Sequence, residues 1–248
     1  MTEMTEMTEM TEMMDEMKNL VHVTADVKEI VKKLYDIFLN NEVDVFLQKY
    51  EKYKTNNFIS EKLYQTAVYK DNVNLIKCLI DNGLEIKIHM LYLAMNHLET
   101  LKLVFEHFTG DITPLDNNEP ALLSTVMYGD LERMKYLIEH CKIKIDKVIG
   151  NLLWHSADKG NYPIFHYLIE LGANVDQDDG FLLYHAVKED NYELMVECVK
   201  AGADIHRHNS RALRMFAKNN NRKAAVFLLE NGANIKVLSR SRRNILYI

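Results

Sequence analysis

The chain has 248 residues, of which 48% are hydrophobic and 27% are charged, and its formal net charge is −6. This composition is typical of a globular protein, while nine glycines and three prolines are too few for a fold built from many β-turns. No apolar run reaches the roughly 18 to 20 residues of a membrane-spanning helix, and the acidic N-terminus lacks the basic start of a secretion signal. We therefore expect an intracellular, cytoplasmic protein with no signal peptide and no membrane contact.

Residues 1–17 consist of Met-Thr-Glu triplets followed by a Met- and Glu-rich tail. A three-residue period fits neither the helical nor the strand repeat, and the segment offers no aromatic cluster for a core. We predict that residues 1–17 are disordered; a fraying helix is the alternative.

Residues 18–58 have the pattern of two helices. Apolar side chains between positions 27 and 38 recur at helical spacing on one face, and Asp26 and Glu29 have the spacing of a capping box. Asn40 and Asn41 end this first helix, and a second begins at Val43. The sequence therefore predicts an N-terminal helical cap over residues 18–58.

A recurring segment follows the cap. It reads Leu-Ile-Glu-Leu-Gly-Ala-Asn-Val at residues 168–175, and related segments occupy residues 79–86, 137–144, 198–205 and 228–235. A second helical stretch precedes each segment, and a short polar turn separates the two stretches. With a weaker copy at residues 91–107, this pattern predicts about six repeats between residues 59 and 235.

Each copy is predicted to be a helix, a tight turn, a second helix and a glycine stop. The glycine supplies the left-handed conformation in which helices often end; the residues in question are Gly83, Gly172, Gly202 and Gly232. Cys141 and Phe108 occupy this position in the two irregular copies. One pair of helices cannot bury its apolar stripe alone, so successive pairs are expected to stack.

These segments resemble the ankyrin repeat, whose second half ends in Leu-Leu-x-x-Gly-Ala-Asp-Val. The first half is degenerate, because residues 152–157 and 182–187 are similar to the family pattern but Thr-Pro-Leu-His itself is absent. The period is 30 instead of about 33 residues. The missing residues fall in the loop that normally projects as a β-hairpin finger, here residues 176–180 and 206–209, so we expect short turns with little strand pairing.

The resemblance implies an all-α fold, an ankyrin-type helical-hairpin solenoid of about six repeats with an N-terminal helical cap. Another helical-hairpin solenoid is the alternative fold. The abbreviated repeats, rich in Asn and Tyr, look like those of ankyrin proteins encoded by giant DNA viruses of amoebae, which implies a viral protein of the host cytoplasm.

Two segments do not fit the repeat. Residues 109–119 lengthen one junction and are expected to form an inserted surface loop, with a binding excursion as the alternative. Residues 236–248 are expected to form a basic, partial C-terminal repeat that caps the last pair. Residues 201–248 carry ten Lys/Arg against Asp204 and Glu230, a balance of +8, which leaves −14 for residues 1–200.

No known catalytic or cofactor-binding template is present, because the sequence lacks Gly-x-Gly-x-x-Gly, a Walker loop, Gly-x-Ser-x-Gly and His-Glu-x-x-His. Cys78, Cys141 and Cys198 are too far apart for a zinc-binding pair, and we expect reduced, buried thiols. His206 and His208 offer only a weak metal site, and an exposed polar loop is the preferred interpretation. The predictions are therefore no enzyme activity, no metal and no cofactor.

The architecture predicts a non-enzymatic scaffold that binds a protein partner, as a monomer, through repeat turns and first helices. By the family's register, the contact residues at the ends of first helices are Asp158, Lys159, Lys188, Glu189, Lys218 and Asn219. Those in the turns are Asp176, Asp178, Asp179, His206, Arg207 and His208. Trp154 is expected either in the core or on the concave surface.

Two alternatives remain open from the sequence. Association with nucleic acid would use the basic residues between positions 207 and 243, but aromatic stacking platforms are lacking there and nucleic acid is the less favoured partner. A ubiquitin-ligase substrate adaptor is implied only by resemblance to viral ankyrin proteins.

Overall fold

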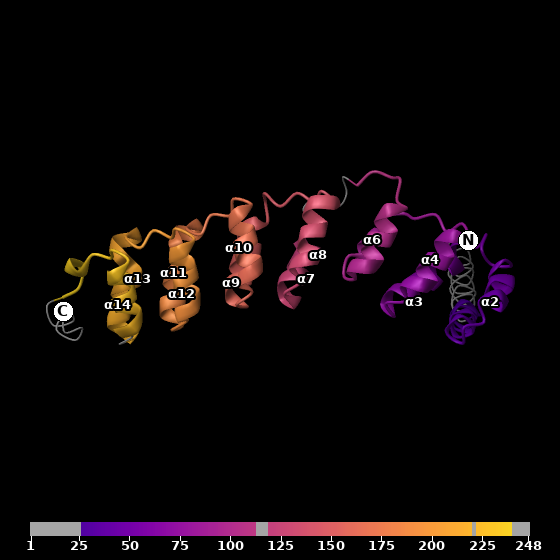
Figure 1. Cartoon of the computed structure of the whole chain (residues 1–248), viewed down its shortest axis with the longest axis horizontal. Helices are drawn as coiled ribbons and strands as arrows, with labels where there is room; N and C mark the ends of the chain where they lie inside the picture. The colour runs from indigo at the N-terminus through magenta and orange to yellow at the C-terminus, as the bar shows by residue number, and fades with distance from the viewer. Residues whose placement is uncertain (1–25, 113–118, 220–221, 240–248) are drawn as a thin grey trace, which may run out of the picture. The chain divides into compact units, whose positions relative to one another are not determined.

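The computed structural model describes residues 26–112, 119–219 and 222–239, with the side chains of residues 208–209 and 216–219 left out. In these residues the regular elements are helices and none is a β-strand (Figure 1). The predicted all-helical class is therefore confirmed. No helix in the described ranges is both long and apolar enough to cross a membrane.

The chain divides into two compact units, Met1–Pro114 and Leu115–Ile248. The first unit begins with a helix over residues 26–39. The helices that follow are α2 (Val43–Tyr50), α3 (Asn57–Tyr69), α4 (Val73–Asp81), α5 (Ile88–Ala94) and α6 (Leu98–Glu106). Helix α3 packs against α4 and α5, and α4 packs against α6. The expected cap contains the hairpin of residues 26–39 and α2, while residues 1–25, including the Met-Thr-Glu segment, lie outside the described residues.

The second unit repeats one hairpin in series (Figure 1). Its first helices are α7 (Glu119–Tyr128), α9 (Ile149–Asp158), α11 (Gln177–Lys188) and α13 (Arg207–Asn219). Its second helices are α8 (Leu131–Lys135) continued by η2 (Tyr136–His140), α10 (Tyr162–Glu170), α12 (Tyr192–Lys200) and α14 (Arg222–Glu230), followed by a short 3-10 turn, η3 (Ile235–Val237). Each first helix contacts the next along the chain, α7 with α9, α9 with α11 and α11 with α13. Of the expected C-terminal cap, residues 240–248 lie outside the described part.

The turn inside most of the described hairpins has a common construction, and the turn between α5 and α6 is the exception. A residue in the left-handed region ends the first helix; these residues are Asn41, Asp71, Gly129, Gly160 and Asp190, with φ between 51° and 68°. In three of these turns the side chain of the next residue also caps the second helix, whereas Glu42 and Asn161 make no such bond. Asn72, Asp130 and Asn191 each accept a hydrogen bond from the backbone N–H three residues later, at 3.0, 2.9 and 3.0 Å. Short polar side chains suit both positions, which explains the polar turns in the sequence.

The second helices end on a left-handed glycine, as predicted. Gly83, Gly172, Gly202 and Gly232 have φ of 94°, 96°, 87° and 99°. The backbone N–H of the following residue bonds the carbonyl five positions earlier, as in Ala203 to Cys198 at 3.0 Å. This geometry is the Schellman motif, which satisfies carbonyls that the helix end would otherwise leave free.

The prediction that Cys141 holds the left-handed position is wrong. That position belongs to Lys142, with φ of 55°, while Cys141 is buried with 1% of its surface exposed. The cause is the π-helical turn η2, which adds one residue to the second helix. The closing hydrogen bond therefore spans six positions, from the N–H of Ile143 to the carbonyl of Leu137 at 3.2 Å.

The other irregular junction follows α6. Phe108 does not take the left-handed conformation expected of it, and its N–H bonds the carbonyl of Phe105 at 3.2 Å. The chain then leaves the helix without a Schellman motif, which leaves this junction without the tight stop of the regular copies. Of the expected inserted loop at 109–119, residues 113–118 lie outside the described residues.

The loops after α10, α12 and α14 are short turns, in agreement with the missing finger. Asn174, Asp204 and Asn234, spaced 30 residues apart, each accept a hydrogen bond from the backbone N–H two residues later at 2.9 to 3.0 Å. In the first of these loops, Asp178 and Asp179 take left-handed φ of 50° and 61° just inside α11. These side chain–backbone bonds fold the loop locally, so strand pairing is not needed to satisfy its backbone.

The predicted apolar stripe of the second helices forms the core between neighbouring hairpins. The side chains at the two equivalent stripe positions are exposed by 1% or less; they are Ile76, Leu79, Met134, Leu137, Phe165, Leu168, Met195, Cys198, Ala225 and Leu228. Buried tyrosine hydroxyls add links in the first unit. Tyr50 donates to Ser60 Oγ at 3.0 Å, and Tyr64 donates to the carbonyl of Met90 at 2.8 Å.

Replacing Gly202 with alanine tests the helix stop. No atom lies within 4 Å of the position that the new Cβ would occupy, so the cost comes from the left-handed backbone alone. We expect the free energy of unfolding to fall by about 1 kcal/mol in a urea titration. Gly202→Asn, which tolerates this conformation, is the matched control and should lose less; equal losses would contradict the backbone explanation.

Tyr64 predicts a pH dependence of stability. Burial raises the pKa of its hydroxyl above the ordinary value of about 10. The folded state therefore holds this proton where the unfolded state releases it, so stability is full below pH 10 and falls as the pH rises above it. Urea titrations at pH 8, 10 and 11 should show a slope up to about 1.4 kcal/mol per pH unit shallower in Tyr64→Phe. The exposed Tyr69→Phe should keep the original slope.

Candidate functional site

One face of the first helices in the second unit is left open by the packing. Helix α9 buries Leu152, Leu153, Ser156 and Ala157, and α11 buries the residues 30 positions later. The residues of each first helix that lie between these buried positions therefore face away from the core, and they align from one first helix to the next. They are Asn151, Trp154 and His155 on α9, Phe181, Tyr184 and His185 on α11, and Arg211 and Arg214 on α13.

Aromatic rings gather on this face across the boundary between α9 and α11. The ring of Trp154 lies 4.7 Å from that of His185 and 5.3 Å from that of Phe181, centroid to centroid. Phe181 and His185 are 5.8 Å apart. Trp154 and His185 are half-buried, and Phe181 keeps 39% of its surface exposed. Trp154 therefore belongs to the open face and not to the core.

A cation extends the cluster onto α13. The guanidinium carbon of the exposed Arg211 lies 3.9 Å from the ring centroid of Tyr184, which is itself 6.0 Å from Phe181. This is a close cation–π contact between consecutive hairpins. We call Trp154, Phe181, Tyr184, His185 and Arg211 the aromatic face. Large aromatic side chains and arginine are the types that dominate binding energy at protein interfaces.

The predicted contact residues at the helix ends lie apart from those in the turns. Asp158 and Lys159 end α9, and Lys188 and Glu189 end α11, whereas the predicted turn residues lie at the start of α11 and α13. A helix of the length of α9 separates the two groups by about 15 Å. Lys188 and Glu189 pair with each other at 2.6 Å and are half-exposed, which contributes little stability. The side chains of Lys218 and Asn219 lie outside the described part.

Asp176, among the predicted contact residues, is engaged in the fold. Its two carboxylate oxygens accept the backbone N–H of Asp204, in the next loop, at 3.1 and 3.0 Å. The guanidinium of Arg207 lies 4.0 Å from Asp176 and 3.8 Å from Asp179. Asp176 therefore joins the loops of consecutive hairpins, and Arg207 is held beside two carboxylates.

Two of the remaining predicted turn residues, Asp178 and His206, are exposed to solvent. The side chain of His208 lies outside the described part. No cluster of three or more His, Cys, Asp or Glu side chains that could hold a metal ion occurs in the described ranges.

The cysteines differ in burial. Cys141 and Cys198 are buried as predicted, and burial raises the pKa of each thiol to about 12. Cys78 is only half-buried, although burial raises its pKa as well. A raised pKa keeps the thiol protonated near neutral pH and suppresses its nucleophilicity.

The contact residues predicted from the sequence did not include the aromatic face, although Trp154 was considered for the concave surface and Arg211 lies among the basic residues of the nucleic-acid alternative. The signal was present in the 30-residue spacing, which aligns Trp154 with Tyr184 and Phe181 with Arg211. The spacing alone does not reveal which aligned positions remain open, because that depends on how deeply each first helix is buried by its neighbours.

No protein-family model matches the chain, and no curated protein matches it either.

Replacing Asp176 with alanine separates a structural role from a binding role. The substitution leaves the N–H of Asp204 without its acceptor and Arg207 without one of its carboxylates. We expect the free energy of unfolding to fall by about 1 to 2 kcal/mol in a denaturant titration. Asp158→Ala, an exposed carboxylate at the end of α9, should change it by less than about 0.5 kcal/mol. If the two variants matched, Asp176 would have no special structural role.

Proposed function

We propose that this chain is a non-enzymatic binding module that holds a protein partner on its aromatic face. The observation that carries the proposal is Phe181, which stays 39% exposed in contact with the rings of Trp154 and His185 on the open face of the first helices. Exposed aromatic rings held rigidly by their neighbours lose little entropy on binding and make large contacts.

We further propose that the hairpins are ankyrin-type repeats. The support is the recurring construction, in which a left-handed glycine is followed by alanine and by an Asn or Asp that folds the next loop, at a 30-residue period. The departure from the family is the loop itself, which forms no strand in the described residues. Binding would then depend on the first helices more than on projecting fingers.

The composition of the face along the unit suggests the chemistry of the partner. Gly129 and Gly160 occupy the same turn position, so Leu123 and Met127 of α7 align with Trp154 and Asp158 of α9. Met127 is 51% exposed. The face thus changes from aliphatic on α7 through aromatic on α9 and α11 to basic on α13, where Arg211 is exposed. The complementary partner presents apolar side chains beside an acidic group.

A nucleic-acid partner has less support from the described residues. Arg207 already lies beside the carboxylates of Asp176 and Asp179, and Arg211 lies over the ring of Tyr184. A phosphate backbone would have to compete with both contacts, and the rest of the chain is acidic.

The aromatic face can be tested by capture from a lysate of the source cells with the full chain as bait. We expect Trp154→Ala and Phe181→Ala each to reduce the retained partner about tenfold, since truncating an interface hot spot costs more than 1 kcal/mol. Leu171→Ala is the matched control, because Leu171 is a large apolar residue, 40% exposed, at the end of a second helix.

Circular dichroism must show the same helix content for all three variants. Equal capture by the face variants and the control would refute the assignment. Retention of nucleic acid that falls steeply with salt would instead favour the alternative partner.

A further inference from the structure

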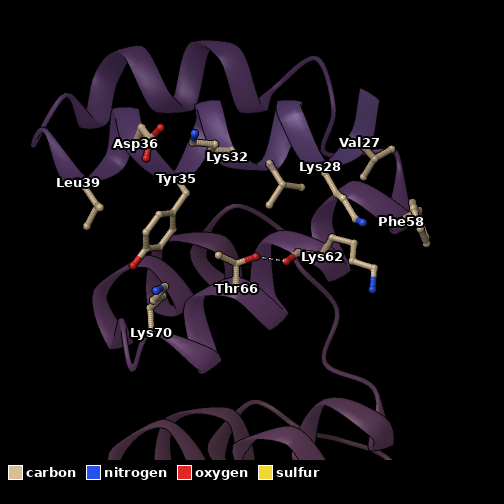
Figure 2. A pocket seen from close by; sticks show the side chains of 11 residues that line it. Val27, Lys28, Lys32, Tyr35, Asp36, Leu39, Phe58, Lys62, Thr66 and Lys70 are labelled. Carbon is tan, nitrogen blue, oxygen red and sulfur yellow. Dashed lines mark hydrogen bonds between the residues drawn. The ribbon is translucent and has the colours of Figure 1, made fainter. Parts of the chain in front are cut away.

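A hollow lies in the first unit between the helix of residues 26–39 and α3. Its volume is about 830 Å³. Side chains from the two helices face each other across it, with Tyr35 and Leu39 on one side and Lys62 and Thr66 on the other (Figure 2). This groove belongs to the first unit alone and shares no residue with the aromatic face.

The floor of the groove is apolar. Val27 and Val31 form its base and are 7% and 6% exposed. Leu39 and Phe58, at its two ends, keep 57% and 45% of their surfaces exposed (Figure 2). Large apolar side chains left open around a concavity are a common mark of an interaction site.

The rim of the groove is basic. It carries Lys28, Lys32, Lys62 and Lys70 against a single carboxylate, Asp36. None of these four lysines forms an ion pair with another described residue. Lys62 bonds the amide oxygen of Gln65 at 2.9 Å instead. Residues 26–112 contain eleven lysines and thirteen Asp or Glu, so this concentration of positive charge is local to the groove.

We propose that the groove binds an acidic amphipathic helix of a partner protein. Charge complementarity selects the acidic flank, since four lysines without carboxylate partners surround an apolar floor. The lining residues from Val27 to Leu39 span about 18 Å of helix, which matches about three turns of a docked helix. The proposal is independent of the aromatic face.

Two other ligands fit the groove less well. A bilayer accepts apolar side chains that project from a surface, whereas these line a hollow. A nucleic-acid strand extends beyond a groove of this length and would meet the net negative charge of the rest of residues 26–112.

The test uses the full chain and a fluorescein-labelled synthetic peptide of 14 residues. In this peptide, leucines at helical spacing form one face and glutamates occupy the other positions; a second peptide replaces each glutamate with lysine. By fluorescence anisotropy we expect saturable binding of the acidic peptide in the micromolar range and at least tenfold weaker binding of the basic peptide.

Charge reversal on the chain provides the matched comparison. Lys28→Glu/Lys32→Glu should weaken binding of the acidic peptide at least tenfold. Lys49→Glu/Lys77→Glu changes the net charge equally at exposed lysines of α2 and α4 outside the groove and should weaken it less than twofold. No binding of the acidic peptide, equal binding of both peptides, or equal loss in both double variants would overturn the proposal.

Two further measurements test whether a lipid surface or the chain's own N-terminal segment occupies the groove instead. Binding to phosphatidylserine-containing vesicles that is lost in Lys28→Glu/Lys32→Glu, with no peptide binding, would assign the groove to a lipid surface. Tighter peptide binding after Glu3, Glu6, Glu9 and Glu12 are changed to lysine would assign it to the chain's own N-terminal segment. Either result would overturn the proposal that the groove binds a helix of a partner protein.

Discussion

The reversal of the chain at the ends of the second helices is the constraint on which this structure depends. In the regular hairpins of the described residues, each reversal places one residue in the left-handed region, which glycine, asparagine and aspartate adopt at low cost. Asp190 and Gly202 meet this demand in one hairpin, 12 residues apart. The distance between the two reversals fixes the helix length, and the helix length fixes which side chains reach the core. When η2 adds a residue, the reversal moves from Cys141 to Lys142 and the apolar contacts stay in place.

Regular burial has a consequence for the exposed surface. Since Leu152 and Leu182 are buried at equivalent positions, the residues that follow them by two, Trp154 and Tyr184, must be open at equivalent positions as well. The core therefore constrains half of each first helix and leaves the other half free to vary in chemistry. In the second unit that freedom gives contacts between aromatic rings and arginine from consecutive hairpins. Such contacts restrict the rings, and this would lower the entropy lost if the proposed partner binds there.

The two proposed surfaces would bind their partners through different physical interactions. The aromatic face would derive its binding energy from the burial of large rings, a contribution that changes little with ionic strength. The groove of the first unit adds four lysines to an apolar floor, so the association rate there should respond to salt. One loop carboxylate that the sequence predicts as a contact residue, Asp176, instead stabilises the fold. Its carboxylate accepts a hydrogen bond from the backbone N–H of Asp204 in the next loop. If Asp176 bound a partner instead, this link between consecutive loops would be lost.

Local chemistry made much of the fold predictable. The all-helical class, the left-handed glycines and the buried stripe follow from residue types at fixed spacing, because capping, reversal and amphipathicity act over a few residues. The proposed binding surfaces were less predictable from the sequence. The π-helical turn was not predicted, and the role of Asp176 and the exposure of Phe181 depend on contacts between residues about 30 positions apart. The sequence by itself therefore determined which segments become helices and where they stop. Only the packing of one hairpin on the next decided which side chains stay exposed, because exposure is a property of neighbours in space.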